Sequence, residues 1–330
     1  MTSTVSVIGL GEIGSSIAMA LKAEENTFTV IGNDFERSAE KTAEENHWVD
    51  RTEHNLFDAV SDAQTVILAI PADQVRKTLE LLGDGLREDA VILDFCPAKK
   101  SAAAWARQFL KHPDRFLGVW AGISPQYLGE PGSGGDSARP DLFKGAMLFA
   151  AAAKDTSDDA IRLAEGLANL LEMECSFTDP AELDGLIAAV YQFPLLAANG
   201  LLSCLNKRPG WKDGKKAAGK LFYTMTSPVA MQTDRTEPGT ALLENRENTV
   251  RILNDYIAEL VSYRNALQSR DETTLRSMIE ENQKNREQWE MDYRKPSHAA
   301  EMPAGTLNIN ASEMIQQVFF GGFLRKKNRD

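Results

Sequence analysis

Residues 5–14 read Val-Ser-Val-Ile-Gly-Leu-Gly-Glu-Ile-Gly, an apolar run that leads into three glycines spaced as G-x-G-x-x-G. In a strand–turn–helix unit, Gly9 permits the tight turn, Gly11 lets the backbone approach a diphosphate, and Gly14 allows the helix to pack closely on the strand. The helix that follows presents unpaired N–H groups and the positive end of its dipole to phosphate oxygens. This stretch predicts a Rossmann-type sheet with a dinucleotide site at the mouth of its first crossover.

The end of the second predicted strand indicates which dinucleotide binds. Asp34 lies twenty positions after Gly14, where a carboxylate accepts hydrogen bonds from the adenosine ribose hydroxyls and repels a 2′-phosphate. Arg37 is close enough in sequence to pair with such a phosphate, so NADP remains the alternative. The carboxylate favours NAD.

A third contribution to this site comes from Ala69-Ile70-Pro71, which ends the predicted strand Thr65–Ile70 at the carboxyl edge of the sheet. Ligands of such sheets bind at this edge, so we expect the backbone there to line the nicotinamide ribose pocket. The structural alternative is a glycine turn that only packs. The predicted cofactor-binding residues are Gly9, Leu10, Gly11, Glu12, Ile13, Gly14, Asp34, Arg37, Ala69, Ile70 and Pro71.

Composition and charge exclude several classes of function. The 330 residues are 43% hydrophobic and 25% charged, which is typical of a globular protein with two cores. The net charge of −12 argues against nucleic acid as a partner, because phosphate binding requires a basic face. Cys96, Cys175 and Cys204 show no metal-ligand spacing, so we expect reduced thiols and no metal site. With no signal-peptide pattern at the N-terminus, the expected compartment is the cytoplasm.

Residues 4–180 alternate short β-branched runs with helical patterns, which predicts βαβ units and a mostly parallel sheet. The predicted strands are Val5–Ile8, Thr27–Ile31, Thr65–Ile70, Ala90–Asp94, Phe116–Trp120, Ala146–Ala150 and Met173–Phe177. The predicted helices are Ile13–Glu25, Glu36–Glu45, Gln74–Leu82, Ala102–Leu110 and Asp158–Leu171. The breaker-rich segment Gly129–Pro140 is a predicted loop, either a lid over substrate or a plain surface excursion.

After residue 180 no strand pattern appears and long helical patterns take over. The predicted organisation is therefore a dinucleotide-binding domain at 1–180, a helical dimerisation and substrate domain at 181–295, and a C-terminal tail at 296–330. Ser269-x-x-Glu272 predicts a capping box that opens the last long helix. One helix carries an apolar stripe that must be buried against something, and a homodimer would bury it. The stripe consists of Val250, Leu253, Ile257, Leu260 and Leu267.

Two further segments were examined for contact with a membrane. Gly185–Asn206 carries no charge, but Gln192, Pro194 and Asn199 would be costly facing lipid, so we interpret it as a buried core helix. The tail ends in an aromatic and basic run, Phe319–Lys327, which we interpret as a docked or frayed terminus rather than a membrane or partner contact. No membrane association is expected.

The residues of the first half resemble the prephenate and arogenate dehydrogenases of tyrosine biosynthesis. Val7–Lys22, VIGLGEIGSSIAMALK, is similar to that family's VIGLGLIGGSIALALK. The resemblance covers roughly residues 4–290 and implies hydride transfer to a nicotinamide, coupled to decarboxylation of a ring acid. Further similar stretches are Val30–Glu45, Thr65–Val75, Phe116–Gly118, Asp141–Ala146, Leu183–Val190 and Asn245–Asn248.

Several positions depart from the motifs that carry the family's chemistry. The central histidine of its HPMAG motif falls at or next to Trp120, and its SHLPH motif falls on Tyr191–Leu195, which keeps only the proline. Its substrate-binding arginine, in a GFRD segment, falls near Phe222–Thr224. The resemblance therefore implies a dehydrogenase whose substrate site has been rebuilt, more aromatic and less cationic.

The family's D-x-x-S-x-K pattern falls on Asp94–Lys99, with Pro97 in place of the serine. Lys99 is the first candidate catalytic residue, because a lysine at the ligand edge can hold a carboxylate or act as an acid–base group if desolvated. The alternative for Lys99 is a solvated lysine beside Lys100. Asp184, near a helix start, is interpreted as a cap rather than a site residue.

Tyr191 is the second candidate catalytic residue, as a hydrogen-bond donor to a carbonyl oxygen, and the alternative is a core aromatic. Trp120, Gln192 and Tyr223 are predicted to line the pocket for a small-molecule substrate. The histidines are interpreted as surface or turn residues: His47, His54, His112 and His298.

Three functions remain open on the sequence. The favoured one is an NAD(P)-dependent oxidoreductase of the prephenate/arogenate type with a rebuilt site. The second is a non-catalytic relative that binds dinucleotide and acts as a sensor or partner protein. The third is a scaffold with a vestigial cofactor site, against which the glycines and Asp34 argue.

Overall fold

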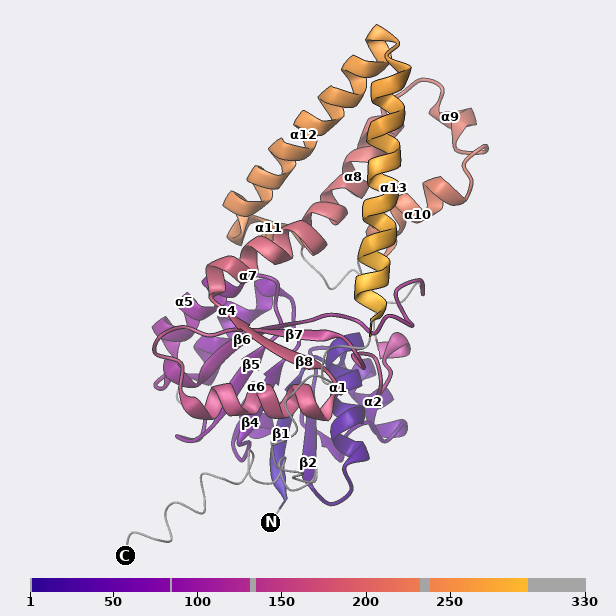
Figure 1. The fold of residues 1–330 in the computed structure, drawn as a ribbon. Coiled ribbons are helices and arrows are strands. Elements are labelled where there is room, and N and C mark those ends of the chain that lie inside the picture. Colours follow the sequence, from indigo (N-terminus) through magenta and orange to yellow (C-terminus); the bar gives the residue numbers. More distant parts are fainter. Residues whose placement is uncertain (1, 84, 131–134, 232–237, 296–330) are drawn as a thin grey trace, which may run out of the picture.

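The computed structural model describes residues 2–83, 85–130, 135–231 and 238–295, and Figure 1 shows their arrangement. Within these ranges the first half forms an eight-stranded sheet in the order β3-β2-β1-β4-β5-β6-β7-β8. Neighbouring strands are parallel except β6 and β7, which are antiparallel. The predicted α/β class, a mostly parallel sheet followed by helices, is confirmed. The strands are β1 Ser3–Ile8, β2 Phe28–Asn33, β3 Arg51–Thr52, β4 Thr65–Leu68, β5 Val91–Asp94, β6 Phe116–Ala121, β7 Met147–Ala151 and β8 Glu174–Thr178.

Helices cover both faces of the sheet, which explains why its central strands are apolar on both sides. In β1, Val5 and Val7 face one apolar cluster with α1, α2 and α6, while Ile8 faces another with α3, α4 and α5. These helices are α1 Glu12–Ala23, α2 Arg37–Glu45, α3 Leu56–Val60, α4 Ala72–Leu82, α5 Lys99–Phe109 and α6 Asp158–Leu170, with short turns η1 Pro113–Arg115 and η2 Gly135–Ser137.

The seven predicted strands are all present, with ends shifted by one or two residues. The edge strand β3 was missed, because two residues, Arg51 and Thr52, carry no periodic signal. Helix α5 begins at Lys99, three residues before the predicted start, for a reason that lies in the second half of the chain.

The second half is helical throughout its described residues, and in Figure 1 its helices rise away from the sheet as long arms. The first arm, Pro180–Asn206, contains a π-helical turn just before Pro194. Proline lacks the N–H that an α-helix needs, and a π turn is a common way to absorb that loss. The helices are α7 Pro180–Ile187, η3 Ala188–Gln192, α8 Phe193–Asn206, α9 Trp211–Gly214, α10 Lys220–Ala230, α11 Pro238–Glu244, α12 Arg246–Ser269 and α13 Glu272–Arg294.

The predicted capping box at Ser269 is wrong. Ser269 is the last residue of α12, and Arg270 turns left-handed with φ of 54° to end that helix. The cap of α13 is Asp271, whose carboxylate accepts a hydrogen bond from the Thr274 amide at 3.0 Å. An aspartate placed directly after the turn reaches the free amides of the next helix better than a serine still inside the previous one.

The interpretation of 185–206 as a buried core helix is also wrong for a single chain. Only 28% of the most apolar window in Pro180–Asn206 is buried, and by length and composition alone this helix could cross a membrane. The apolar stripe of α12 is likewise uncovered: Val250 is 53% exposed, Ile257 50% and Leu267 62%. The helical half thus presents apolar surface that the described residues of one chain leave exposed. The predicted tail, 296–330, lies outside the described residues.

Candidate active site

The glycine turn has the geometry that its spacing suggested. Gly9 has φ of +96°, and a Cβ there would lie 2.4 Å from the Ala69 carbonyl oxygen. A Cβ on Gly14 would lie 1.9 Å from the Gly9 carbonyl oxygen, so strand, turn and helix touch through these two residues. A Cβ on Gly11 would meet nothing within 4 Å. Gly9 and Gly14 therefore pack the turn, while Gly11 leaves open space in front of the backbone.

Helix α1 begins directly behind this open space. Gly11 is its N-cap and supplies no side-chain hydrogen bond, which leaves the first amides directed outward toward any anion placed there. Glu12 and Ile13 follow as the first helical residues. Burial raises the pKa of the Glu12 carboxyl, and the positive charge of Arg139 partly offsets this.

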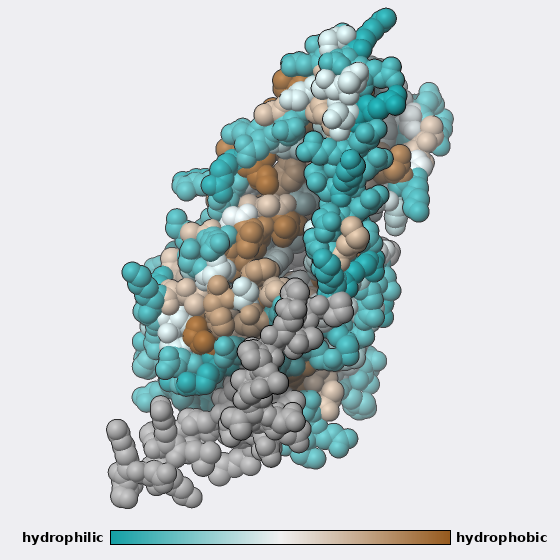
Figure 2. Space-filling model, in the orientation of Figure 1, coloured by the Kyte–Doolittle hydropathy of each residue, from teal (hydrophilic) through white to brown (hydrophobic). Residues whose placement is uncertain are grey.

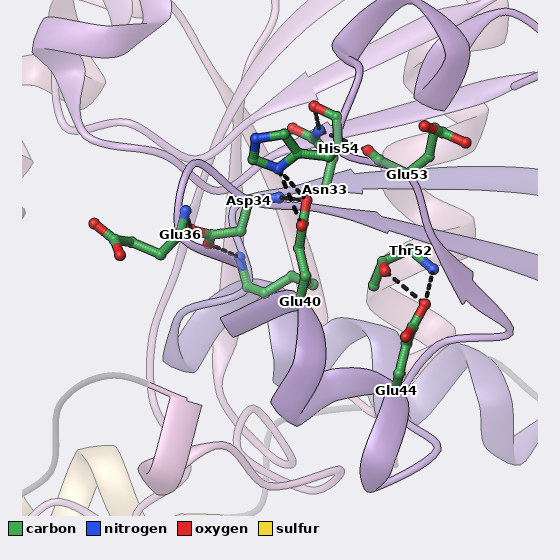
Figure 3. A network of polar contacts seen from close by, with 9 residues as sticks. Asn33, Asp34, Glu36, Glu40, Glu44, Thr52, Glu53 and His54 are labelled. Carbon is green, nitrogen blue, oxygen red and sulfur yellow. Dashed lines mark hydrogen bonds and ion pairs between the residues drawn. The ribbon is translucent and has the colours of Figure 1, made fainter. Parts of the chain in front are cut away.

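Asp34 lies at the end of β2, beside the glycine turn (Figure 3). Its Oδ2 accepts a hydrogen bond from the Leu10 amide at 2.7 Å, and its Oδ1 accepts one from the Glu36 amide at 2.8 Å. Each carboxylate oxygen retains further lone pairs, so the group is oriented but still able to accept ribose hydroxyls. Arg37 is exposed at the start of α2.

Ala69-Ile70-Pro71 borders the same turn from the neighbouring strand. The Ala69 amide donates to the Ile8 carbonyl at 2.8 Å, so the chain continues pairing for one residue past the end of β4. Pro71 is then the N-cap of α4, in extended conformation, which ends the strand and starts the helix. The predicted cofactor residues of β1, β2 and β4 thus come together at one edge of the sheet.

The described end of the predicted loop Gly129–Pro140 contacts α1. The Arg139 amide donates to Ser16 Oγ at 2.9 Å, and a Cβ on Gly135 would lie 3.3 Å from the Leu10 carbonyl oxygen. Arg139 also pairs with Glu130 at 2.7 Å and lies over the ring of Tyr127. The described end of Gly129–Pro140 therefore packs against the dinucleotide-binding turn; residues 131–134 lie outside the described residues.

The alternative interpretation of Lys99 as a solvated lysine is wrong, while its catalytic role stays a prediction. Its side chain is 0% exposed, and its Nζ donates to the Asp94 carbonyl at 2.8 Å with the Asp94 carboxylate at 3.8 Å. Burial raises the pKa of the Asp94 carboxyl, and the Lys99 charge only partly offsets this. Lys99, the first residue of α5, thus directs its side chain away from solvent onto the end of β5.

The cap interpretation of Asp184 is correct, but the helix it caps is α5 rather than its own. Its Oδ1 accepts from the Lys99 amide at 2.7 Å and its Oδ2 from the Lys100 amide at 3.0 Å. A carboxylate at this helix start satisfies two free amides, which explains why α5 begins at Lys99. Burial raises the pKa of Asp184, and these two hydrogen bonds oppose the rise.

Gln192 does not line the substrate pocket as predicted. It is 1% exposed, and its amide nitrogen donates to the Pro97 carbonyl at 3.1 Å and the Ala241 carbonyl at 3.0 Å. Its Oε1 accepts from Asn245 Nδ2 at 2.9 Å and Thr249 Oγ1 at 3.0 Å. Both donors and both lone pairs are occupied, so the residue ties the helical arms to the end of β5 and has nothing left for a ligand.

Trp120 and Tyr191, by contrast, lie together. Their ring centroids are 5.2 Å apart in an edge-to-face contact, Trp120 at the end of β6 and Tyr191 in the π turn. Trp120 packs against the apolar cluster of Leu183 and Ile187, while Tyr191 remains 44% exposed. Partial burial raises the pKa of the Tyr191 hydroxyl, which keeps it protonated at neutral pH. Tyr191 is therefore not the core aromatic of the alternative interpretation.

Tyr223 is not brought to this pair within one chain. It is 66% exposed on α10, a helix that packs against α8, and the described ring contacts link it to neither Trp120 nor Tyr191. Among the described residues no three His, Cys, Asp or Glu side chains come together as metal ligands.

Sequence reasoning missed one group at the cofactor end. His54 does not lie simply at the surface: its Nδ1 contacts both oxygens of the buried Glu40 carboxylate, at 3.1 and 3.0 Å. Glu40 in turn accepts a hydrogen bond from the Asp34 amide at 3.2 Å (Figure 3). A glutamate on a surface helix and a histidine in a loop carry no local signal that they meet.

Comparison with known proteins agrees with this geometry. Residues 17–174 match the family model described as prephenate dehydrogenase, nucleotide-binding domain. The prephenate dehydrogenase of Bacillus subtilis is 27% identical over 284 residues, which cover 83% of this chain and 73% of that protein. The cyclohexadienyl dehydrogenase of Zymomonas mobilis is 23% identical, with 86% of this chain and 94% of that protein covered. The nucleotide-binding half of the chain therefore resembles the prephenate dehydrogenase family, and the two bacterial relatives extend that similarity over most of the chain.

Solved structures show the same fold over both halves. Prephenate dehydrogenase from Aquifex aeolicus, in complex with hydroxyphenyl propionate and NAD+, has a TM-score of 0.76 at 20% identity, with 87% of this chain and 98% of that chain covered. Synechocystis arogenate dehydrogenase has a TM-score of 0.68 at 20% identity, with 87% and 99% covered. The family match of the nucleotide-binding half and the shared fold support an NAD-dependent oxidoreductase, the function that the sequence favoured.

Proposed function

We propose that this chain oxidises a prephenate- or arogenate-like ring acid of tyrosine biosynthesis in the cytoplasm, with NAD as hydride acceptor and a rebuilt, aromatic substrate site. The observation that supports this is the Trp120–Tyr191 pair, which lies at the carboxyl edge of β6. Ligands of open α/β sheets bind at that edge, and the glycine turn lies on it as well. Trp120 falls at or next to the position of the family's central histidine, and Tyr191 opens the segment on which its SHLPH motif falls.

NAD fits the other end of the site. The amides at the start of α1 suit the diphosphate, Gly11 leaves room for its approach, and Asp34 is oriented to accept the ribose hydroxyls. The bound cofactor supplies the hydride-accepting ring. The protein supplies orientation, exclusion of water and a proton-holding hydroxyl.

Tyr191 has the properties of the group that holds the substrate oxygen. A tyrosine hydroxyl is protonated at neutral pH, and partial burial raises the pKa of this one further, so it can donate a hydrogen bond to a carbonyl or hydroxyl oxygen. The edge of the Trp120 ring against Tyr191 fixes the direction of that hydroxyl. Trp120 also offers an apolar surface to the substrate ring.

A homodimer would cover the apolar surface of the helical half. Figure 2 shows hydrophobic residues gathered on one face of the molecule. Leu186 and Val190 of the first arm are 42% and 65% exposed, and Leu260 of α12 is 48% exposed. A contiguous apolar face of this kind is typical of a protein interface. We propose that a second copy of the chain covers it, rather than lipid or nucleic acid, because Asp184 and Gln192 of the same arm are hydrogen-bonded to α5 and the end of β5.

The proposal is tested by incubating the purified chain with NAD and either prephenate or arogenate and following NADH absorbance. Turnover should appear with one of them, and Tyr191→Phe should lower kcat about 10- to 100-fold with little change in the Kd for NADH. Cys204→Ser, at an exposed position on the same helical arm, serves as the control. Turnover that is equal in Tyr191→Phe and wild type would refute the role of Tyr191.

One observation favours the second candidate, a dinucleotide-binding sensor without turnover. The lysine that remains from the family's motif, Lys99, is fully buried, and the contacts of its Nζ are with Asp94. Thermal shift by NAD without turnover of either acid would support the sensor. Sedimentation with and without NAD then shows whether the cofactor changes the assembly.

A further inference from the structure

Glu40 is an unusual residue for a surface helix. It lies on α2 next to the adenosine end of the candidate site, yet its side chain is only 7% exposed. Removing a carboxylate from water is costly unless hydrogen bonds replace the lost solvent. A buried acid directly behind a ribose-binding carboxylate therefore requires an explanation.

The contacts of Glu40 connect it to Asp34 on one side and to His54 on the other (Figure 3). Its Oε1 accepts a hydrogen bond from the Asp34 amide at 3.2 Å, while His54 Nδ1 lies 3.1 and 3.0 Å from its two oxygens. His54 Nδ1 donates in its Nδ1–H tautomer and in its cationic form alike. Asp34 is thus held at its carboxylate by Leu10 and Glu36, and at its backbone by Glu40.

The loop that carries His54 is itself fixed to β2. Asn33 Nδ2 donates to the backbone carbonyls of Glu53 at 2.8 Å and His54 at 3.2 Å. Asn33 directly precedes Asp34 in the chain and is 6% exposed. The end of β2 and the histidine loop therefore form one rigid unit behind the ribose position.

We propose that Glu40, held by His54, is a positioning and specificity-determining residue for the dinucleotide. It fixes the backbone of Asp34, and it adds a second negative charge that excludes the 2′-phosphate of NADP. This inference rests on the proposed use of NAD. The charge acts strongly because a buried carboxylate is screened by salt much less than an exposed one.

Other charged side chains near the end of β2 do not take the place of the Glu40 carboxylate. Glu44, one turn further along α2, is bonded to the Thr52 amide at 2.8 Å and is exposed. Arg51 pairs with Glu53 at 3.6 Å, outside the Asp34–Glu40 contact. Glu36 and Arg37 stand at the start of α2.

The test measures binding rather than turnover, on the full chain. Kd values for NADH and NADPH are obtained by fluorescence titration for wild type, Glu40→Gln and Glu44→Gln. Glutamine keeps an oxygen for the Asp34 amide and removes the charge, together with one of the two oxygens that contact His54. Glu40→Gln should therefore lower the Kd for NADPH about tenfold and change that for NADH less than about threefold. Glu44→Gln, the matched control on the same helix, should change neither.

The positioning role is tested at His54. His54→Leu removes the donor to Glu40 and should raise the Kd for NADH about fivefold, while His54→Asn, which can still donate, should restore it to within about twofold of wild type. Circular dichroism melts show that each variant is folded.

Two results would overturn the inference while leaving the cofactor assignment intact. One is wild-type binding of NADH together with an NADPH/NADH selectivity that is the same in Glu40→Gln and Glu44→Gln. The other is a Kd for NADH that His54→Leu leaves at the wild-type value. If wild type binds neither dinucleotide, the proposed function fails, and this inference fails with it.

Discussion

The two ends of the candidate site are built in different ways. At the cofactor end, Gly9, Gly11, Gly14 and Asp34 lie within one strand–helix–strand unit and work through backbone geometry. At the substrate end, Trp120 and Tyr191 come from elements 71 residues apart in the chain and are placed by buried polar contacts between the two halves. A site made by local backbone can be predicted from spacing, whereas a site made by long-range contacts cannot.

The largest expected effect is at Gln192, whose buried hydrogen bonds join the two halves that bring the substrate end together. Gln192→Leu keeps the volume but removes four buried hydrogen bonds, to the Pro97 and Ala241 carbonyls and from the Asn245 amide and the Thr249 hydroxyl, so we expect a loss of about 4 kcal/mol in unfolding free energy. Urea denaturation measures it. Asn199→Ala is the control, because Asn199 bonds only to the Leu195 carbonyl of its own helix, and it should cost about 1 kcal/mol or less. Equal losses in both variants would mean that the tie between halves is unimportant.

The cofactor end should respond next most strongly, and in two separable ways. Gly14→Ala places a methyl group 1.9 Å from the Gly9 carbonyl and should lower the unfolding free energy by about 3 kcal/mol. Gly11→Ala meets nothing within 4 Å, so the protein should fold almost normally while the Kd for NADH rises by about a factor of 10 or more. Denaturation and NADH titration distinguish them. Normal NADH binding by Gly11→Ala would place the diphosphate elsewhere.

A smaller effect is expected in the pH dependence of the unfolding free energy, at the buried Asp94 carboxyl. Because burial raises the pKa of Asp94 above 3.8, the protonated carboxyl stabilises the folded state at low pH, and this contribution is lost as pH rises through the folded pKa. Wild type should therefore gain unfolding free energy relative to Asp94→Asn as the pH is lowered from 8 toward 4. Groups with lowered pKa values, such as Asp89 and Asp141, act in the opposite sense in both proteins and cancel in the difference. A difference independent of pH would contradict the buried pair.

The smallest expected effect tests the helix cap that replaced the predicted one. Asp271→Ala should lower the unfolding free energy by about 1 kcal/mol, because the Thr274 amide loses its acceptor. Ser269→Ala should change it by less than about 0.5 kcal/mol, since that hydroxyl bonds only within α12. Thermal melts of the pair give the comparison. The reverse order would restore the capping box at Ser269.

The predictions that failed share a physical cause. Lys99 and Gln192 were interpreted from their place beside strand ends and family motifs, but burial by the helical half decided what their polar atoms contact. The same holds for Glu40 and His54, which lie 14 residues apart and meet only because β3 returns beside β2. No local pattern reports that kind of contact.

By itself the sequence determined the succession of strands and helices along the first half. It also determined the glycine turn with its acidic partner Asp34, and the change to helices after residue 180. These follow from hydrophobic periodicity and from backbone conformations that only glycine and proline favour, and both act over a few neighbouring residues. Only the tertiary structure decided that Lys99 is buried, that Asp184 caps α5, and that Trp120 meets Tyr191. Those outcomes depend on which surfaces exclude water from each other, a property of segments distant in the chain.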